Sequence, residues 1–309
     1  MNDSAQNPNR WKTVLKKALQ WAIALAAYAF LIHTLYTFDH YSDLLPLLRQ
    51  ASCRHFLALT TGLLLMPLNL LLEAWKWQTL LKTIEPLTLR NAFRQVCYGM
   101  AGAFVTPYRI GDYPARVLLL KDKNHYLSAI TMAAVGSVAL TAVILLLGIP
   151  AFALSFTRYQ AFPTWNSQTY LWLISLLLCV LLLVFALVPF MGKRYGIKYS
   201  DCGIILLQSL LRYLCFSLQL WLMLYACGVS LPLMVALVSI PLYYLFVTVT
   251  PNMPVADIGI RGAWAVFIFG QYIHDMQAHI IMATTCLWFI NTLLPVLFGA
   301  AGIKCSKSA

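Results

Sequence analysis

Two short segments of the sequence combine charged residues with helix breakers between long apolar runs. Residues 106–116 read TPYRIGDYPAR, and residues 250–262 read TPNMPVADIGIRG. Charges are costly within a bilayer, and proline and glycine interrupt helices, so such segments persist only where they line a protein-enclosed cavity. The guanidinium groups of Arg109, Arg116 and Arg261 offer planar, paired donors that suit a phosphate. These three arginines are therefore candidate anion-binding residues.

The acidic residues of the two segments have two interpretations. Asp112 and Arg116 are four residues apart, the spacing of an ion pair on one helix face. The simplest role of Asp112 and Asp257 is thus to neutralise neighbouring arginines, although either carboxylate could instead hold a proton or a cation. Arg116 could also extend to the membrane interface. Because Asp112 cannot fully neutralise both Arg109 and Arg116, we expect positive charge to remain in the first segment.

Other residues of the two segments are expected to shape the backbone. A threonine hydroxyl can satisfy backbone groups that the following proline frees, and a helix that begins after a glycine presents free N–H groups and a positive dipole end. The structural residues are Thr106, Pro107, Gly111, Thr250, Pro251 and Gly259. The sequence therefore predicts a broken helix in each segment.

The composition indicates an integral membrane protein. The 309-residue chain is 61% hydrophobic and 10% charged, whereas a soluble domain carries about a quarter charged residues. The net charge of +12 is therefore interpreted as a topology signal, and no nucleic-acid partner is expected. The eight cysteines include no C-x-x-C pair, and His274 and His279 fall on different faces of a helix. We expect no metal and no cofactor.

Apolar runs predict about six full transmembrane helices. They cover residues 20–38, 55–81, 127–152, 170–190, 203–227 and 278–302. The helices around the two breaks are expected to form two re-entrant hairpins. These helices cover residues 87–106, 113–120, 231–249 and 263–272. Lys and Arg concentrate on one side of the spans, which predicts that both termini are cytoplasmic.

The two halves of the chain follow the same order in opposite orientation. Each half reads span, hairpin, span, and the first half starts outside whereas the second starts inside. Such inverted-topology repeats place a site between two half-spanning elements. We therefore predict a single all-helical transmembrane domain over residues 1–303. Its parts are residues 1–54 (a helix and an external loop), 55–153 (first repeat), 154–202 (linking helix and loops) and 203–303 (second repeat), followed by a cytoplasmic tail, 304–309.

The breaks also carry a resemblance to a known family. The stretch GMAGAFVTPYRIGDYPARVLLLKD is similar to the signature of the flippase-like domain family, the transmembrane region of bacterial lysylphosphatidylglycerol synthases and their stand-alone relatives. TPNMPVADIGIRG resembles the second motif of that family, with Asp257 where a glycine is usual and Gly262 where a glutamate is usual. The resemblance covers about residues 10–303.

The resemblance implies that the chain moves a phospholipid, or another anionic or zwitterionic lipid, between the leaflets of the bacterial inner membrane. The headgroup phosphate would bind Arg109, Arg116 and Arg261 in a cavity between the two hairpins. The aminoacyl-transfer domain of full-length synthases is not expected after Gly302, so we do not expect the chain to synthesise aminoacylated lipid. A homo-oligomer or a lipid-synthase partner is compatible with the resemblance.

Arg212 is a further candidate because it lies deep in an apolar span. Its possible partners are Glu73, Asp257 or a lipid headgroup. Glu73 is three residues before Lys76, and a local pair between them is the simplest interpretation of that carboxylate.

Two other function classes stay open at this point. A membrane-embedded enzyme acting on lipid headgroups would need a nucleophile or paired carboxylates at a break, where only Asp112 and Asp257 are available. No Ser-His-Asp set, P-loop or dinucleotide fingerprint occurs in the sequence. A partner that scaffolds a lipid synthase without transporting lipid is the third class.

Overall fold

The structure is a computed structural model that describes six stretches of the chain. They are residues 52–106, 109–157, 167–194, 199–250, 257–273 and 276–297. Within these stretches the regular structure is entirely helical, as the sequence predicts, and no strand occurs. The expected span at residues 20–38 and the two prolines Pro107 and Pro251 lie outside the described residues.

The first repeat consists of two long helices around a pair of shorter ones. Its helices are α3 (Cys53–Leu81), α4 (Leu89–Val105), α5 (Asp112–Val117) and α6 (Tyr126–Thr157). A 3₁₀ turn, Lys123–His125, leads into α6. We call α4, α5 and the residues between them hairpin 1. All four helices begin and end close to their predicted positions.

A single helix, α7 (Ser167–Arg194), links the first repeat to the second. The second repeat contains α8 (Tyr199–Ala226), α9 (Leu233–Val249), α10 (Asp257–Phe269) and α11 (Gln277–Trp288). The chain continues from α11 through a π-helical turn, Phe289–Leu293. We call α9 and α10 hairpin 2.

The second arm of hairpin 2 begins earlier than the sequence predicts. The expected helix starts at residue 263, whereas α10 starts at Asp257, so Gly259 and Arg261 lie within the helix rather than before it. An aspartate in the first turn is favourable at the positive end of the helix dipole. A single glycine costs a helix only about 1 kcal/mol relative to alanine, which is too little to stop it.

Four of the described helices are long and apolar enough to cross a membrane. They span Cys53–Leu81, Lys123–Ser155, Ser200–Ala226 and Gln277–Leu297. Large apolar side chains such as Leu64, Leu127 and Trp172 are about 70% exposed on the outside of the molecule, as a lipid-facing surface requires. The chain is therefore a multi-pass membrane protein, and the total number of spans stays a prediction.

The opening helices of the two repeats pack against each other in opposite directions. The side-chain amide of Gln208 near the start of α8 donates to the Thr79 hydroxyl near the end of α3, at 2.9 Å. The side-chain amide of Gln219, eleven residues further along α8, donates to the carbonyl oxygen of Gly62, well before Thr79 on α3, also at 2.9 Å. The contacts run in opposite sequence order, so the helices are antiparallel, the arrangement that an inverted repeat requires.

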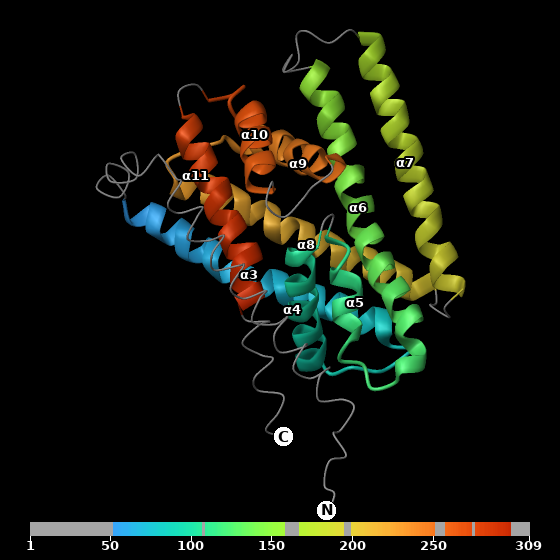
Figure 1. The fold of residues 1–309 in the computed structure, drawn as a ribbon. Coiled ribbons are helices and arrows are strands. Elements are labelled where there is room, and N and C mark those ends of the chain that lie inside the picture. The colour runs from blue at the N-terminus through green and yellow to red at the C-terminus, as the bar shows by residue number, and fades with distance from the viewer. Residues whose placement is uncertain are drawn as a thin grey trace, which may run out of the picture.

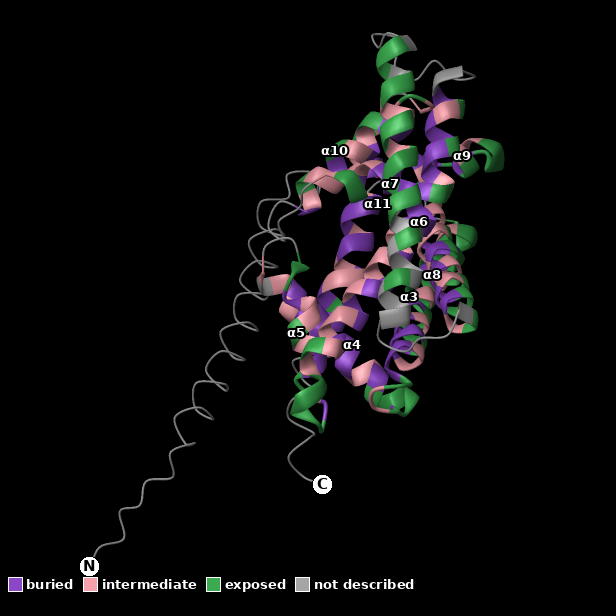
Figure 2. Cartoon of the chain, turned by 90° about the vertical axis from the view of Figure 1, so that its right-hand side faces the viewer, coloured by how far each residue is buried: buried purple, intermediate pink, exposed green. Residues whose placement is uncertain are grey.

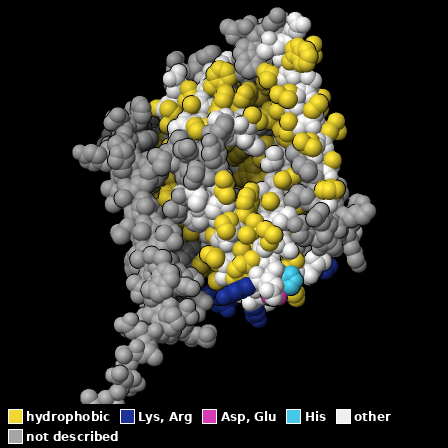
Figure 3. Space-filling view, turned by 45° about the vertical axis from the view of Figure 1, so that its right-hand side comes forward, with side chains coloured by type: hydrophobic (Ala, Val, Ile, Leu, Met, Phe, Trp, Pro, Cys, Tyr) yellow, Lys and Arg dark blue, Asp and Glu magenta, His cyan; other side chains and the backbone are white. Residues whose placement is uncertain are grey.

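The two hairpins lie toward opposite ends of the molecule. Figures 1 and 2 place α4 and α5 at one end and α9 and α10 toward the other, with α3, α6 and α8 between them. In the space-filling view, hydrophobic side chains cover the visible described face, and Lys and Arg gather at the end that holds hairpin 1 (Figure 3). This distribution fits a bilayer-embedded body with one basic end.

Candidate functional site

Hairpin 1 closes tightly because glycines stand where its arms cross. A Cβ atom on Gly102 of α4 would collide with the carbonyl oxygen of Gly111 and would lie 2.5 Å from the Ala115 Cβ. A Cβ atom on Gly99 would collide with the Asp112 carboxylate. The small-residue run of α4 is therefore a helix-packing surface.

A threonine hydroxyl joins the two arms of each hairpin. Thr106 Oγ1 donates to the carbonyl four residues earlier at 3.0 Å and accepts the N–H of Gly111 at 2.7 Å. Thr250 Oγ1 likewise donates to the carbonyl four residues earlier at 2.7 Å, and it accepts the indole N–H of Trp264 in α10 at 2.9 Å. Both hydroxyls donate to a carbonyl near the end of a helix, that of Gly102 or Phe246, whereas the following prolines would free the carbonyls of residues 103 and 247. The predicted satisfaction of proline-freed groups therefore stays a prediction.

Arg116 is neutralised by two carboxylates. Its Nε and Nη2 donate to the two oxygens of Asp112 at 2.7 and 2.8 Å, and its Nη1 donates to Glu73 Oε1 at 2.7 Å. The guanidinium also lies 5.7 Å from the ring centroid of Trp77. The residue is only 6% exposed, so its guanidinium is held inside the protein by these ion pairs. The predicted pairing of Asp112 with Arg116 is confirmed.

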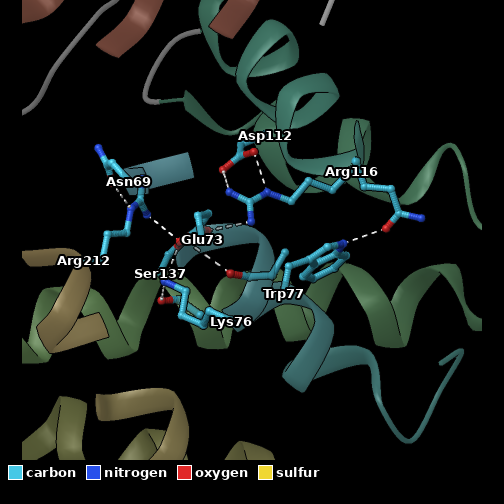
Figure 4. A network of polar contacts seen from close by, with 11 residues as sticks. Asn69, Glu73, Lys76, Trp77, Asp112, Arg116, Ser137 and Arg212 are labelled. Atoms are coloured by element: carbon cyan, nitrogen blue, oxygen red, sulfur yellow. Dashed lines mark hydrogen bonds and ion pairs between the residues drawn. The ribbon is translucent and has the colours of Figure 1, made fainter. Parts of the chain in front are cut away.

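Glu73 is the centre of a buried charge network that sequence analysis did not select as a site (Figure 4). Besides Arg116, its carboxylate pairs through Oε2 with Arg212 Nη1 at 2.6 Å and with Lys76 Nζ at 2.8 Å. Arg212 Nε donates in addition to the side-chain oxygen of Asn69 at 2.9 Å. The partner of Arg212 is therefore Glu73, one of the three that the sequence allows. The local Glu73–Lys76 pair is present as well.

A sequence signal for this network was available on α3. Asn69, Glu73 and Lys76 follow one another at intervals of four and three residues inside an apolar helix. That spacing puts three polar side chains on one helix face, and all three are buried. A polar face within an apolar helix indicates an interior partner, but it does not identify which one.

Hairpin 2 carries a similar ion pair with different surroundings. Arg261 Nε donates to Asp257 Oδ1 at 2.7 Å, and the second oxygen of Asp257 accepts the indole N–H of Trp288 at 2.8 Å. Asp257 is buried, whereas the Arg261 side chain is 22% exposed. Each hairpin thus has an aspartate as the first residue of its second arm and an arginine four residues later.

Arg109 differs from the other candidate arginines. It is exposed, and its side chain has no hydrogen bond or ion pair with any residue in the described stretches. It is also the only non-glycine residue of those stretches with a positive φ, 58°. The residue sits between α4 and α5, at the tip of hairpin 1.

Arg109 lines a small pocket where the two breaks meet. Asp257 and Trp288 line the same pocket from the second repeat, and Phe104 and Thr292 are also at its wall. The cavity has a volume of about 20 Å³, room for one or two water molecules. A phosphate would have to widen it. One residue of each predicted break, Arg109 and Asp257, thus lines the same pocket, and the approach of the breaks at the membrane midplane stays a prediction.

No metal site competes with this interpretation in the part of the chain that the structure describes. That part contains no cluster of three His, Cys, Asp or Glu side chains that could hold a metal ion. His274 and Asp275, which flank the predicted external end of the second repeat, lie outside it.

The fold and the site define an all-helical, multi-pass membrane protein with buried charge at two broken helices. The family model for the lysylphosphatidylglycerol synthase TM region matches residues 18–299, and the chain belongs to that family. A search of curated proteins found no match.

Proposed function

We propose that the protein moves a phospholipid, or another lipid with an anionic or zwitterionic headgroup, between the leaflets of the bacterial inner membrane. The family ties the chain to lipid metabolism or translocation. In the proposed mechanism, the headgroup enters the pocket between the two hairpins while the acyl chains stay in the bilayer.

Arg109 carries the proposal. An arginine at membrane depth costs at least about 2.5 to 3.5 kcal/mol, and a left-handed backbone adds about 1 to 2 kcal/mol for a residue with a Cβ. Arg109 combines this strained backbone with a side chain that makes no direct ion pair or hydrogen bond with a described residue, while the carboxylates of Asp257 and Asp112 attract it from a longer distance. Such strain is typically kept at functional sites. A guanidinium that faces a cavity under these conditions suits an anionic headgroup phosphate.

The other candidate residues support Arg109 in different ways. Asp257 and Trp288 line the pocket from the second repeat. Arg261 balances the charge of Asp257 and, with its partly exposed side chain, adds positive potential for the phosphate. Arg116 and Arg212 are committed to the Glu73 network, so we assign them to the scaffold of the site rather than to the lipid.

The orientation follows from the basic end of the molecule. We propose that both termini are cytoplasmic and that hairpin 1 opens to the cytoplasm and hairpin 2 to the outside. A single cysteine introduced at position 196 should react with an impermeant thiol reagent only after cells are permeabilised. Labelling of this cysteine on intact cells would contradict the proposed orientation.

The test of lipid movement uses purified protein in proteoliposomes with fluorescent phospholipid. Arg109→Ala and Arg261→Ala should each abolish lipid movement, and Arg109→Lys should restore only part of it because an ammonium lacks the paired donor geometry. Arg90→Ala is the matched control, since Arg90 is an exposed arginine near the start of the same helix, α4, and should be silent. Wild-type rates in both Arg109 variants would contradict the proposal.

Recovery of the lipid separates transport from chemistry. The labelled lipid should be recovered chemically unchanged after it has moved. A modified headgroup would instead support the membrane-embedded enzyme.

A further inference from the structure

We propose that Glu73 is a positioning residue for the lipid site: it ties hairpin 1 to the antiparallel helices α3 and α8 so that Arg109 keeps facing the pocket. This inference rests on the proposed function, because it assigns Glu73 a part in lipid binding. The structural part of the claim, that Glu73 holds hairpin 1 in place, can be tested without measuring lipid transport.

The two oxygens of Glu73 bind different parts of the molecule. Oε1 accepts from Arg116, which belongs to α5, and Oε2 accepts from Arg212, which belongs to α8. The carboxylate itself stands on α3 and is 4% exposed. One buried side chain therefore links hairpin 1 of the first repeat to the opening helices of both repeats.

The Glu73–Arg116 ion pair restrains Arg109 because the two arginines are close in the sequence. Arg116 holds Asp112, the first residue of α5, through two hydrogen bonds. Three residues before Asp112 is Arg109, and the segment around it is closed by the hydrogen bond between Thr106 and Gly111. A shift of α5 therefore displaces the backbone at Arg109, and the Arg109 side chain that lines the pocket moves with it.

Charge balance alone would be a simpler role for Glu73. The network contains three cations, Lys76, Arg116 and Arg212, and two carboxylates, Glu73 and Asp112, so it holds one excess positive charge. Removing a buried carboxylate strands its partners and is destabilising whatever its role. The test must therefore restore the charge balance without restoring the link.

A double variant meets this requirement. Glu73→Gln combined with Arg212→Gln removes one charge of each sign, so the network keeps its single excess positive charge while the Glu73–Arg116 ion pair is lost. Arg212→Gln alone keeps that ion pair and removes only the connection to α8. Glu85→Gln is the control for the substitution itself, since Glu85 is a partly buried carboxylate just beyond α3.

Hydrogen exchange in nanodiscs reports the position of hairpin 1. The amides of Ala115 and Leu118 are hydrogen-bonded in the structure, to the carbonyls of Gly111 and Ala115. In the double variant we expect these amides to exchange roughly tenfold faster or more, because α5 opens locally, while α3 stays protected. Glu85→Gln should exchange as the wild type does, and Arg212→Gln, which loses the connection to α8 but keeps the Glu73–Arg116 ion pair, should exchange more slowly than the double variant does.

Lipid titration then reports the consequence for the site. The double variant should need about 10- to 100-fold more lipid for half-maximal transport, since a small displacement of a binding group has effects of that size. The single variant Glu73→Asp should need less lipid for half-maximal transport than the double variant and more than the wild type, because it keeps the carboxylate charge on a shorter side chain.

The outcomes separate the two proposals. Wild-type exchange at Ala115 and Leu118 in the double variant overturns the positioning role, and so does faster exchange with wild-type lipid dependence. If wild-type protein itself moves no lipid, the proposed function fails, and the exchange data still decide whether Glu73 positions hairpin 1.

Discussion

The two hairpins are built from the same ingredients and stabilised in different ways. Each has a threonine at the end of its first helix and an Asp-x-x-x-Arg pair that begins its second helix. In hairpin 1 the arginine of that pair reaches a second carboxylate, Glu73. In hairpin 2 the aspartate of the pair reaches an indole, that of Trp288.

Because of this difference, hairpin 1 is held by more ionic contacts than hairpin 2. Arg116 is buried between two carboxylates, whereas Arg261 has a single described carboxylate and a partly exposed side chain. Hairpin 1 therefore holds its pair rigidly and presents Arg109 from a fixed tip. Hairpin 2 brings Asp257 to the same pocket with fewer ionic restraints. If the pocket must widen for a headgroup, we expect the movement on the side of hairpin 2 and α11.

The largest predicted effect concerns how closely the arms of each hairpin pack. Gly102→Ala should destabilise the protein by about 3 kcal/mol, since overpacking costs about 1 to 3 kcal/mol and the new methyl group meets backbone that cannot move aside. Gly259→Ala should instead stabilise it by about 0.4 to 1 kcal/mol, because a Cβ there meets nothing within 4 Å and α10 loses a flexible residue. Unfolding in detergent micelles measures both changes.

Both variants add one methyl group to a glycine of a hairpin, so they differ only in the hairpin that receives it. Equal losses would mean that hairpin 2 packs as tightly as hairpin 1, and the comparison would fail.

The second prediction concerns the aspartates. Asp257→Asn should cost about 2 to 3 kcal/mol, below the range for a fully buried pair because Arg261 is 22% exposed. Asp112→Asn should cost only about 1 kcal/mol, since Arg116 keeps its ion pair with Glu73. The measurement is the same unfolding experiment. A larger loss for Asp112→Asn would show that Glu73 does not brace hairpin 1.

Local spacing explains which parts of this arrangement could be predicted from the sequence. The helices follow from apolar runs and breakers, and the Asp112–Arg116 pair follows from an i,i+4 spacing within one short helix. The threonine contacts with the preceding carbonyls are local as well. The all-helical fold, the membrane setting and the family were all recognisable for the same reason.

Long-range contacts explain what could not be predicted. Arg116 and Arg212 are 43 and 139 residues away from Glu73 along the chain, and no local pattern connects them. The positive φ of Arg109 is a property of the folded hairpin, because nothing in the residue type favours it. Trp288 was unexpected in the site because it comes from the closing helix of the second repeat, 31 residues after Asp257.

The smallest predicted effect tests what the hairpins share. Thr106→Val and Thr250→Val each leave a donor without its acceptor: the Gly111 N–H in the first case and the Trp264 indole N–H in the second. Stranding one donor costs about 1 to 3 kcal/mol, and both hydrogen bonds are partly buried, so we expect similar losses of about 1 kcal/mol. Thr60→Val is the control, because that exposed hydroxyl donates only to carbonyls of its own helix and strands no donor when removed. Thermal unfolding of the three variants in one detergent decides the matter. A loss at Thr106 with none at Thr250 would mean that the second hydroxyl does not join its hairpin, and the equivalence of the two breaks would rest on the Asp-x-x-x-Arg pairs alone.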